Sequence, residues 1–174
     1  MADCRLQLPS FRIPVQMIIE AIVSGGQTGA DRAALDWALE HHVPHQGWCP
    51  NGRRAEDGAI SSRYLLQETP ASGYVVRTEW NVRDSDGTVI FTIKPIASGG
   101  SLATIRFADT HRKPWIHLSR DASRDPADEL LEFVEMNQIR HLNVAGPRTS
   151  GAPEISDFVQ GVLAQAFAAN SAYA

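Results

Sequence analysis

The sequence predicts an α/β protein with an open, mostly parallel sheet and helices on both faces. Short apolar runs rich in β-branched residues alternate along the chain with segments whose apolar residues recur at helical spacing. Such alternation is typical of strands joined by crossover helices. Three of the runs lead directly into turns of glycine and other small residues, as strands do before phosphate-binding helix starts.

The chain has 174 residues, which suits a single domain with a substantial core. We expect this domain to be ligand-binding and to span residues 17–170. Residues 1–16 contain Pro9 and Pro14 and predict an irregular N-terminal arm.

The composition argues against several classes of protein. A net charge of -4 does not favour a general nucleic-acid-binding surface. Cys4 and Cys49 lie in unlike contexts, which favours free thiols in a reducing compartment. No apolar stretch approaches the length of a membrane span, and the N-terminus lacks a secretion signal. We therefore expect a cytoplasmic protein that does not associate with membranes.

The first predicted strand leads into the most prominent glycine turn. Residues 18–23 form an apolar run of the length of a buried strand. Gly25, Gly26 and Gly29 follow, and apolar residues recur at helical spacing from about Ala30. The start of a helix leaves backbone N–H groups unpaired and carries a positive partial charge, so it suits phosphate or another anion.

A second predicted strand, residues 45–49, precedes a long polar loop at residues 50–72. Loops of this length beside a strand end are often functional. Arg53, Arg54 and Glu56 belong to a run of alternating charge in this loop. The run is compatible with a solvated ion-paired loop, and also with guanidinium groups that close over a phosphate.

Residues 74–84 predict a helix with Val75 on its buried side. Arg77, Asn81 and Asp84 fall at i, i+4 and i+7, so they share one face. This face is compatible with an exposed ion pair and with a ligand site.

The strongest predicted strand, residues 88–93, leads into a second glycine turn. This turn, residues 98–101, contains Gly99 and Gly100 and precedes a helix over residues 102–112. Thr104 lies on the first turn of that helix and can add a hydroxyl group.

The last part of the chain repeats the pattern. Residues 115–118 predict a strand, and residues 125–136 predict a helix with proline and acids in its first turn. Residues 141–145 predict the fifth strand, which runs into a third small-residue turn at residues 146–151. A helix over residues 154–167 follows.

The three small-residue turns should lie together, because loops at the carboxyl ends of parallel strands meet at one edge of a sheet. They therefore predict a pocket for an anionic ligand. We expect no structural metal, since Pro44 breaks the helix that would align His41, His42 and His45 as ligands.

Four motifs of the chain resemble the molybdenum carrier family, which is related to the molybdenum cofactor carrier proteins. They are SGGQTGADRAALD at residues 24–36, GWCPNGRRAEDG at 47–58, TEWNVRDSDGT at 78–88, and the SGGSLAT turn. The resemblance covers nearly the whole chain after Met17. It implies a Rossmann-like sheet of about five or more strands, a phosphate- or nucleotide-type pocket and assembly into homo-oligomers.

The leading hypothesis is a non-catalytic carrier that holds a phosphorylated small molecule, either molybdenum cofactor (molybdopterin) or a nucleotide. Backbone and hydroxyl donors of the turns would bind the phosphate, and arginines would neutralise its charge. The resemblance favours Arg53 for this second role. The expected binding residues are Gly25, Gly26, Thr28, Gly29, Arg53, Asn81, Gly99, Gly100, Ser101, Thr104, Arg148 and Thr149.

Two alternative functions remain open from the sequence. The resemblance extends to lysine-decarboxylase-like phosphoribohydrolases, which use a glutamate downstream of their glycine turn, whereas the helix after SGGSLAT offers only Asp109. A nucleotide N-glycosidase would then need Glu56, Glu79 or Asp84 to activate water. The second alternative is a nucleotide sensor that acts through a protein partner.

Overall fold

A computed structural model describes residues 19–95 and 97–167 of the chain. Its main strands are β1 (Ala21–Val23), β2 (His45–Gln46), β7 (Gly87–Thr92), β8 (Trp115–Ser119) and β9 (His141–Ala145). Its helices are α2 (Ala30–Glu40), α3 (Tyr74–Arg83), α4 (Gly99–Thr110), α5 (Pro126–Met136) and α6 (Ile155–Ala166). The N-terminal arm predicted for residues 1–16 lies outside the described residues.

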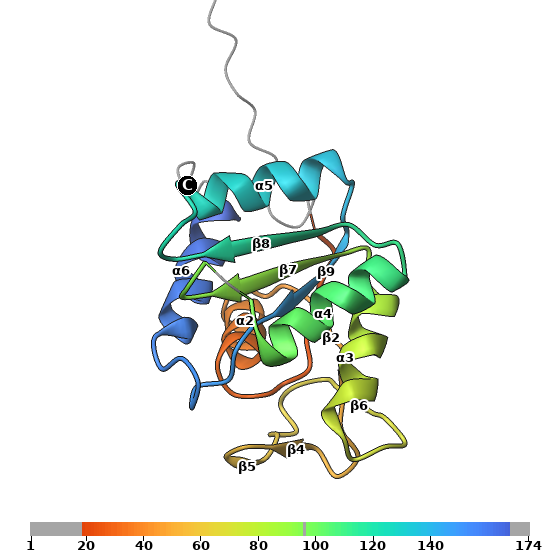
Figure 1. Cartoon of the computed structure of the whole chain (residues 1–174). Helices are drawn as coiled ribbons and strands as arrows, with labels where there is room; N and C mark the ends of the chain where they lie inside the picture. The colour runs from red at the N-terminus through yellow and green to blue at the C-terminus, as the bar shows by residue number, and fades with distance from the viewer. Residues whose placement is uncertain (1–18, 96, 168–174) are drawn as a thin grey trace, which may run out of the picture.

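The five main strands form one parallel sheet in the order β2-β1-β9-β7-β8. Helices α2 and α6 pack together on one face, and α3 and α4 pack together on the other (Figure 1). Helix α5 contacts β8 and α6. The predicted open parallel α/β sheet with helices on both faces is therefore confirmed.

The middle of the sheet is formed by its last strand in sequence. Strand β9 pairs with β1 through Ile22 and Leu142, and with β7 through Val89 and Val144. If β9 preceded β1 in the chain, the strand order would read 3-2-1-4-5, which is the order of the doubly wound dinucleotide-binding sheet. The fold is thus that sheet with its first strand moved to the end of the chain.

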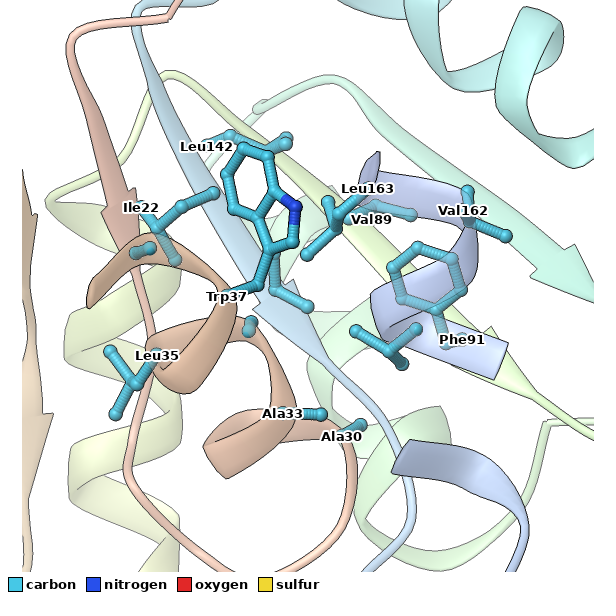
Figure 2. Packing of buried hydrophobic residues seen from close by; sticks show 14 of the residues in the cluster. Ile22, Ala30, Ala33, Leu35, Trp37, Val89, Phe91, Leu142, Val162 and Leu163 are labelled. Atoms are coloured by element: carbon cyan, nitrogen blue, oxygen red, sulfur yellow. The ribbon is translucent and has the colours of Figure 1, made fainter. Parts of the chain in front are cut away.

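The core on the α2 side is built from aliphatic and phenylalanine side chains around one tryptophan. All six residues of β7 are buried. The Trp37 ring of α2 points toward Leu142 of β9 and Leu163 of α6 (Figure 2). This packing fixes α2 on the sheet, so the turn that precedes α2 has a rigid support.

The structure differs from the sequence-based prediction in several places. The strand expected at residues 45–49 is interrupted at Gly47, after which β3 (Trp48–Cys49) pairs with β6 (Gln67–Glu68) outside the main sheet. Helix α4 begins at Gly99 rather than at residue 102. The prediction that Val75 is buried is wrong, because Val75 is 66% exposed.

The predicted loop at residues 50–72 is more ordered than expected. It contains β6 and a short antiparallel pair of β4 (Arg54–Ala55) and β5 (Gly58–Ala59). Its Ile60, Tyr64 and Leu66 join the hydrophobic core. No helix in the described part of the chain is long and apolar enough to span a membrane.

Gly47 yields the first testable prediction. Its φ of 146° is unfavourable for other residues, and a Cβ there would lie 2.1 Å from the Ser24 carbonyl oxygen. Gly47→Ala should lower the free energy of unfolding by at least about 2 kcal/mol. The measurement is urea denaturation followed by circular dichroism.

Gly161→Ala is the matched control, because Gly161 lies in α6 and a Cβ there meets no atom within 4 Å. It should raise the free energy of unfolding by about 0.5–1 kcal/mol. Equal effects of the two substitutions would contradict the close approach at Gly47.

Candidate functional site

A cavity of about 430 Å³ opens at the carboxyl edge of the sheet. It lies where the loops after β9 and β7 diverge toward opposite faces, which is the usual position of a ligand crevice in such sheets. Its lining residues come from the β1–α2 turn, the start of α3, the β7–α4 loop with the start of α4, and the β9–α6 turn. They are Gln27, Tyr74, Arg77, Thr78, Thr92, Ile93, Lys94, Ser98, Gly99, Gly100, Ser101, Gly146, Pro147, Arg148, Gly151 and Ala152.

All charged side chains among the described residues that line this cavity are positive. Arg77, Lys94 and Arg148 line it, and no aspartate or glutamate does. The guanidinium carbons of Arg77 and Arg148 lie 5.9 and 5.7 Å from the Tyr74 ring centroid, so cation–π contacts connect the three side chains. The cavity is therefore suited to an anionic ligand.

The N-terminus of α4 opens into the same cavity. The N–H groups of Ser101 and Leu102 donate to the Ser98 carbonyl oxygen. Those of Gly99 and Gly100 have no acceptor among the described residues. Thr104 Oγ1 donates to the Gly100 carbonyl oxygen at 3.0 Å and so fastens the first turn. The positive end of α4 is thus available to a ligand.

A smaller cavity of about 50 Å³ lies next to the large one and shares Arg77 and Gly100 with it. Asp31, Asn81 and Asn143 are among its further lining residues, and all three are buried. This volume accommodates one or two water molecules or one small polar group.

A buried ion pair lies against the small cavity. Arg77 Nη1 is 2.7 Å from Asp31 Oδ2, and the side chains are 14% and 5% exposed. Burial raises the pKa of Asp31 above its ordinary value, while the neighbouring Arg77 acts in the opposite direction. Arg77 Nε is buried and has no hydrogen-bond partner among the residues that the structure describes.

The turn between β1 and α2 differs from the α4 start in how its donors are used. The Gln27 N–H donates to Asp31 Oδ2 at 3.4 Å, and the Thr28 N–H to Gln27 Oε1 at 3.1 Å. The Ala30 N–H donates to the Pro147 carbonyl oxygen. These amides of the turn are therefore paired within the protein.

Several predicted binding residues on the α2 side do not line the two cavities. Gly26 packs against Leu66, since a Cβ there would lie 2.7 Å from Leu66 Cδ1. Thr28, Gly29 and Thr149 instead line a separate, more open hollow of about 530 Å³ on the α2 side.

Gly29 and Thr149 bring the first and third glycine turns into direct contact. A Cβ at Gly29 would lie 2.5 Å from the Pro147 carbonyl oxygen. The Thr149 N–H donates to Thr28 Oγ1 at 3.2 Å. The two turns thus meet as predicted, but at this point they bind each other.

Arg53 lies away from the cavities and binds its own loop. Its guanidinium donates to four backbone carbonyl oxygens, at distances of 2.9–3.1 Å. These belong to Ile60, Ser61, Tyr64 and Leu66. The structure thus places the predicted phosphate-neutralising arginine in a structural role.

Asn81 lines the small cavity, but its amide group is used by the backbone. Its Oδ1 accepts from the Trp48 N–H at 2.7 Å, and its Nδ2 donates to the Trp48 carbonyl oxygen at 2.9 Å. Asn81 therefore joins α3 to β3.

Glu56 holds the β9–α6 turn. It accepts hydrogen bonds from Thr28 Oγ1, from the Ser150 N–H at 3.1 Å and from Ser150 Oγ at 2.5 Å. Bonds from Ser150 and Thr28 hold the pKa of Glu56 below its ordinary value of 4.5. Arg148 Nε lies 3.9 Å from Glu56 Oε2, so Glu56 also helps to place a cation at the cavity.

The other carboxylates considered for catalysis are also bound elsewhere. Glu79 is 3.1 Å from His111 Nε2, and Asp109 accepts from Trp115 Nε1 at 2.8 Å. Asp84 accepts from Trp48 Nε1 and pairs with Arg83. Within the described residues, no group of three or more histidine, cysteine, aspartate or glutamate side chains could hold a metal ion.

The structure brings together part of the predicted site and adds residues to it. The predicted residues that line one or both cavities are Gly25, Asn81, Gly99, Gly100, Ser101, Thr104 and Arg148, and the unpredicted Gln27, Tyr74 and Lys94 join them. Arg77 was visible in the sequence only as part of a polar helix face. Its i, i+4 spacing to Asn81 is compatible with a ligand site, but the same spacing fits an exposed ion pair, so this signal alone does not select Arg77.

Comparisons with known proteins give concordant matches. Residues 22–167 match the model of the circularly permutated YpsA SLOG family. The crystal structure of a protein named "Putative molybdenum carrier protein", from Syntrophus aciditrophicus at 1.45 Å resolution, is 45% identical to this chain. The match has a TM-score of 0.84 and covers 87% of this chain and 96% of the other. No protein of curated function matches the chain.

The position of Arg53 leads to a prediction about the loop at residues 50–69. Arg53→Ala should leave four carbonyl oxygens without their donor, so amides of residues 60–66 should exchange with solvent at least about tenfold faster. Amides of β7 should be unaffected. Hydrogen exchange followed by mass spectrometry makes this measurement, with the exposed neighbour Arg54→Ala as the control.

The lowered pKa of Glu56 predicts a pH dependence. Its contribution to stability should be complete above pH 4.5 and lost as pH falls through the lower pKa of the folded state. Glu56→Gln should therefore be less stable than the wild type at neutral pH, and the difference should shrink in acid. Thermal unfolding across this pH range tests it. A difference between the two proteins that does not shrink as the pH is lowered from neutral into strong acid would contradict an ionised Glu56 at the β9–α6 turn.

Proposed function

Because the chain belongs to the circularly permutated YpsA SLOG family, we propose that it is a binding or carrier protein for a phosphorylated small molecule. The phosphate binds at the N-terminus of α4, and the rest of the molecule fills the 430 Å³ cavity. This volume falls within the range of small-molecule sites.

One observation carries the proposal. The open N-terminus of α4 and three cationic side chains face one cavity whose described lining has no carboxylate. Backbone donors at a helix start and nearby guanidinium groups are the usual means of binding phosphate. Gly100 also leaves room, since a Cβ there would meet no atom within 4 Å.

The same lining favours binding over hydrolysis. Hydrolysis of a glycosidic bond needs a carboxylate or histidine within reach of the substrate. The described lining of the large cavity contains neither, and the Asp31 carboxylate at the small cavity is paired with Arg77. The side chains that remain can hold, orient and release a ligand.

The cargo we favour is molybdenum cofactor, bound through the phosphate of molybdopterin. Support comes from the 45% identical neighbour, whose name describes a molybdenum carrier. A nucleotide has the same terminal phosphate and a planar heterocycle of similar size, so it is the alternative cargo. Tyr74, Ile93 and Pro147 give the cavity the less polar surface that either ring system needs.

The proposal predicts which glycine controls binding. Gly100→Val places a branched side chain in the space for the phosphate without a clash inside the protein. It should weaken binding of AMP and of inorganic phosphate at least about tenfold, or ~1.4 kcal/mol. Isothermal titration calorimetry measures the affinity for AMP. The rise in melting temperature on adding inorganic phosphate measures the affinity for phosphate.

Gly161→Val is the control, since it adds the same side chain to an open position on α6. It should retain wild-type affinity. Native mass spectrometry of protein purified from its own cells should then identify the cargo, as pterin with molybdenum or as a nucleotide. A folded Gly100→Val variant with undiminished affinity would refute this phosphate position.

A further inference from the structure

We propose that Asp31 is an internal counter-ion that competes with the ligand's phosphate for Arg77 and thereby keeps the cargo exchangeable. This inference rests on the proposed function and concerns the same cavity. It assigns a regulatory role to a buried carboxylate that does not touch the large cavity.

The ion pair connects helices from opposite faces of the sheet. Asp31 lies in the first turn of α2, and Arg77 projects from α3. The two meet above Gly25, where a Cβ would lie 1.9 Å from Arg77 Nη1 and 3.0 Å from Asp31 Oδ2. Arg77 therefore occupies the space in front of the β1–α2 turn.

Asp31 takes the place that an anion would take at α2. Its Oδ2 accepts from the Gln27 N–H at 3.4 Å and lies at the positive end of the helix. The first turn of α4 has no acidic residue. The two glycine turns thus differ: the turn before α2 has its own anion, Asp31, whereas the turn before α4 leaves the position of an anion open.

Arg77 has unused capacity for an acceptor. A guanidinium has five donor hydrogens, whereas Arg77 donates to one acceptor among the described residues, Asp31, through Nη1. Its Nε is buried without a partner in the described part of the chain, and the side chain lines both cavities. A phosphate in the large cavity can therefore approach the same guanidinium that Asp31 holds.

The consequence is a reduced attraction for the ligand. Asp31, at 2.7 Å, offsets part of the charge of Arg77, so the attraction of the ligand phosphate depends more on Lys94 and Arg148, whose carboxylate neighbours lie at 3.9 Å. These two side chains are 81% and 50% exposed, and solvent and salt screen their charges. A carrier must release its cargo as well as bind it, and this arrangement lowers affinity without removing the site.

The test is Asp31→Asn, which removes the charge and retains the shape. With inorganic phosphate as the probe, the variant should bind about tenfold more tightly than the wild type. Without phosphate it should melt at a lower temperature, because Arg77 loses its counter-ion. Phosphate should therefore raise its melting temperature by more than it raises that of the wild type.

Asp36→Asn provides a control of equal charge change. Asp36 lies on the same helix, pairs with Arg63 and does not line either cavity. It should leave the phosphate affinity unchanged. Equal tightening in both variants would show a general charge effect and overturn the role of Asp31.

The remaining outcomes are also decisive. Unchanged or weaker phosphate binding by Asp31→Asn means that Asp31 only holds Arg77 in place, and the inference fails while the proposed function stands. Absence of phosphate binding by the wild type refutes both. If Asp31→Asn does not fold even with phosphate, Asp31→Ser, which retains an acceptor for the Gln27 N–H, should show the same tightening, and its absence overturns the inference.

Discussion

Backbone N–H groups at the carboxyl edge of the sheet need acceptors, and the way they obtain them decides where a ligand can bind. At the β1–α2 turn, the N–H groups of Gln27, Thr28 and Ala30 obtain acceptors from Asp31, Gln27 and Pro147. At α4 the N–H groups of Gly99 and Gly100 have no acceptor in the described part of the chain. The same strand-turn-helix motif is thus used once to hold the fold together and once to leave an anion site open.

Polar side chains around this edge are largely used to hold backbone. Arg53 binds the carbonyl oxygens of its own loop, and Asn81 binds both backbone groups of Trp48. Glu56 binds the turn that carries Arg148. These side chains resemble ligand-binding groups in type, but their contribution is to give the cavity a fixed wall.

The sequence predicted the main architecture because its signals are local. Strands such as Gly87–Thr92 and helices such as Pro126–Met136 follow from apolar periodicity and from turn and cap residues. The meeting of the glycine turns follows from the geometry of parallel strands. The interruption at Gly47 could not be foreseen, since it depends on the close approach of Ser24, which directly follows β1.

The candidate site was only partly predictable, because hydrogen-bond pairing depends on residues far apart in the chain. Arg53 and Arg77 look equivalent in the sequence. The fold surrounds Arg53 with carbonyl oxygens and brings Arg77 to Asp31, which lies 46 positions away. Likewise, whether Thr28 faces a ligand depends on Glu56 and Thr149, which occupy its hydroxyl group.

The central position of β9 has a consequence for how the chain is made. During synthesis on the ribosome, β1 and β7 are complete long before residues 141–145 emerge, so each keeps an unpaired edge in the meantime. Exposed edges of this kind invite pairing with other chains. A chain cut short before β9 would therefore lack the strand that joins the two halves of the sheet, and it would be prone to aggregate.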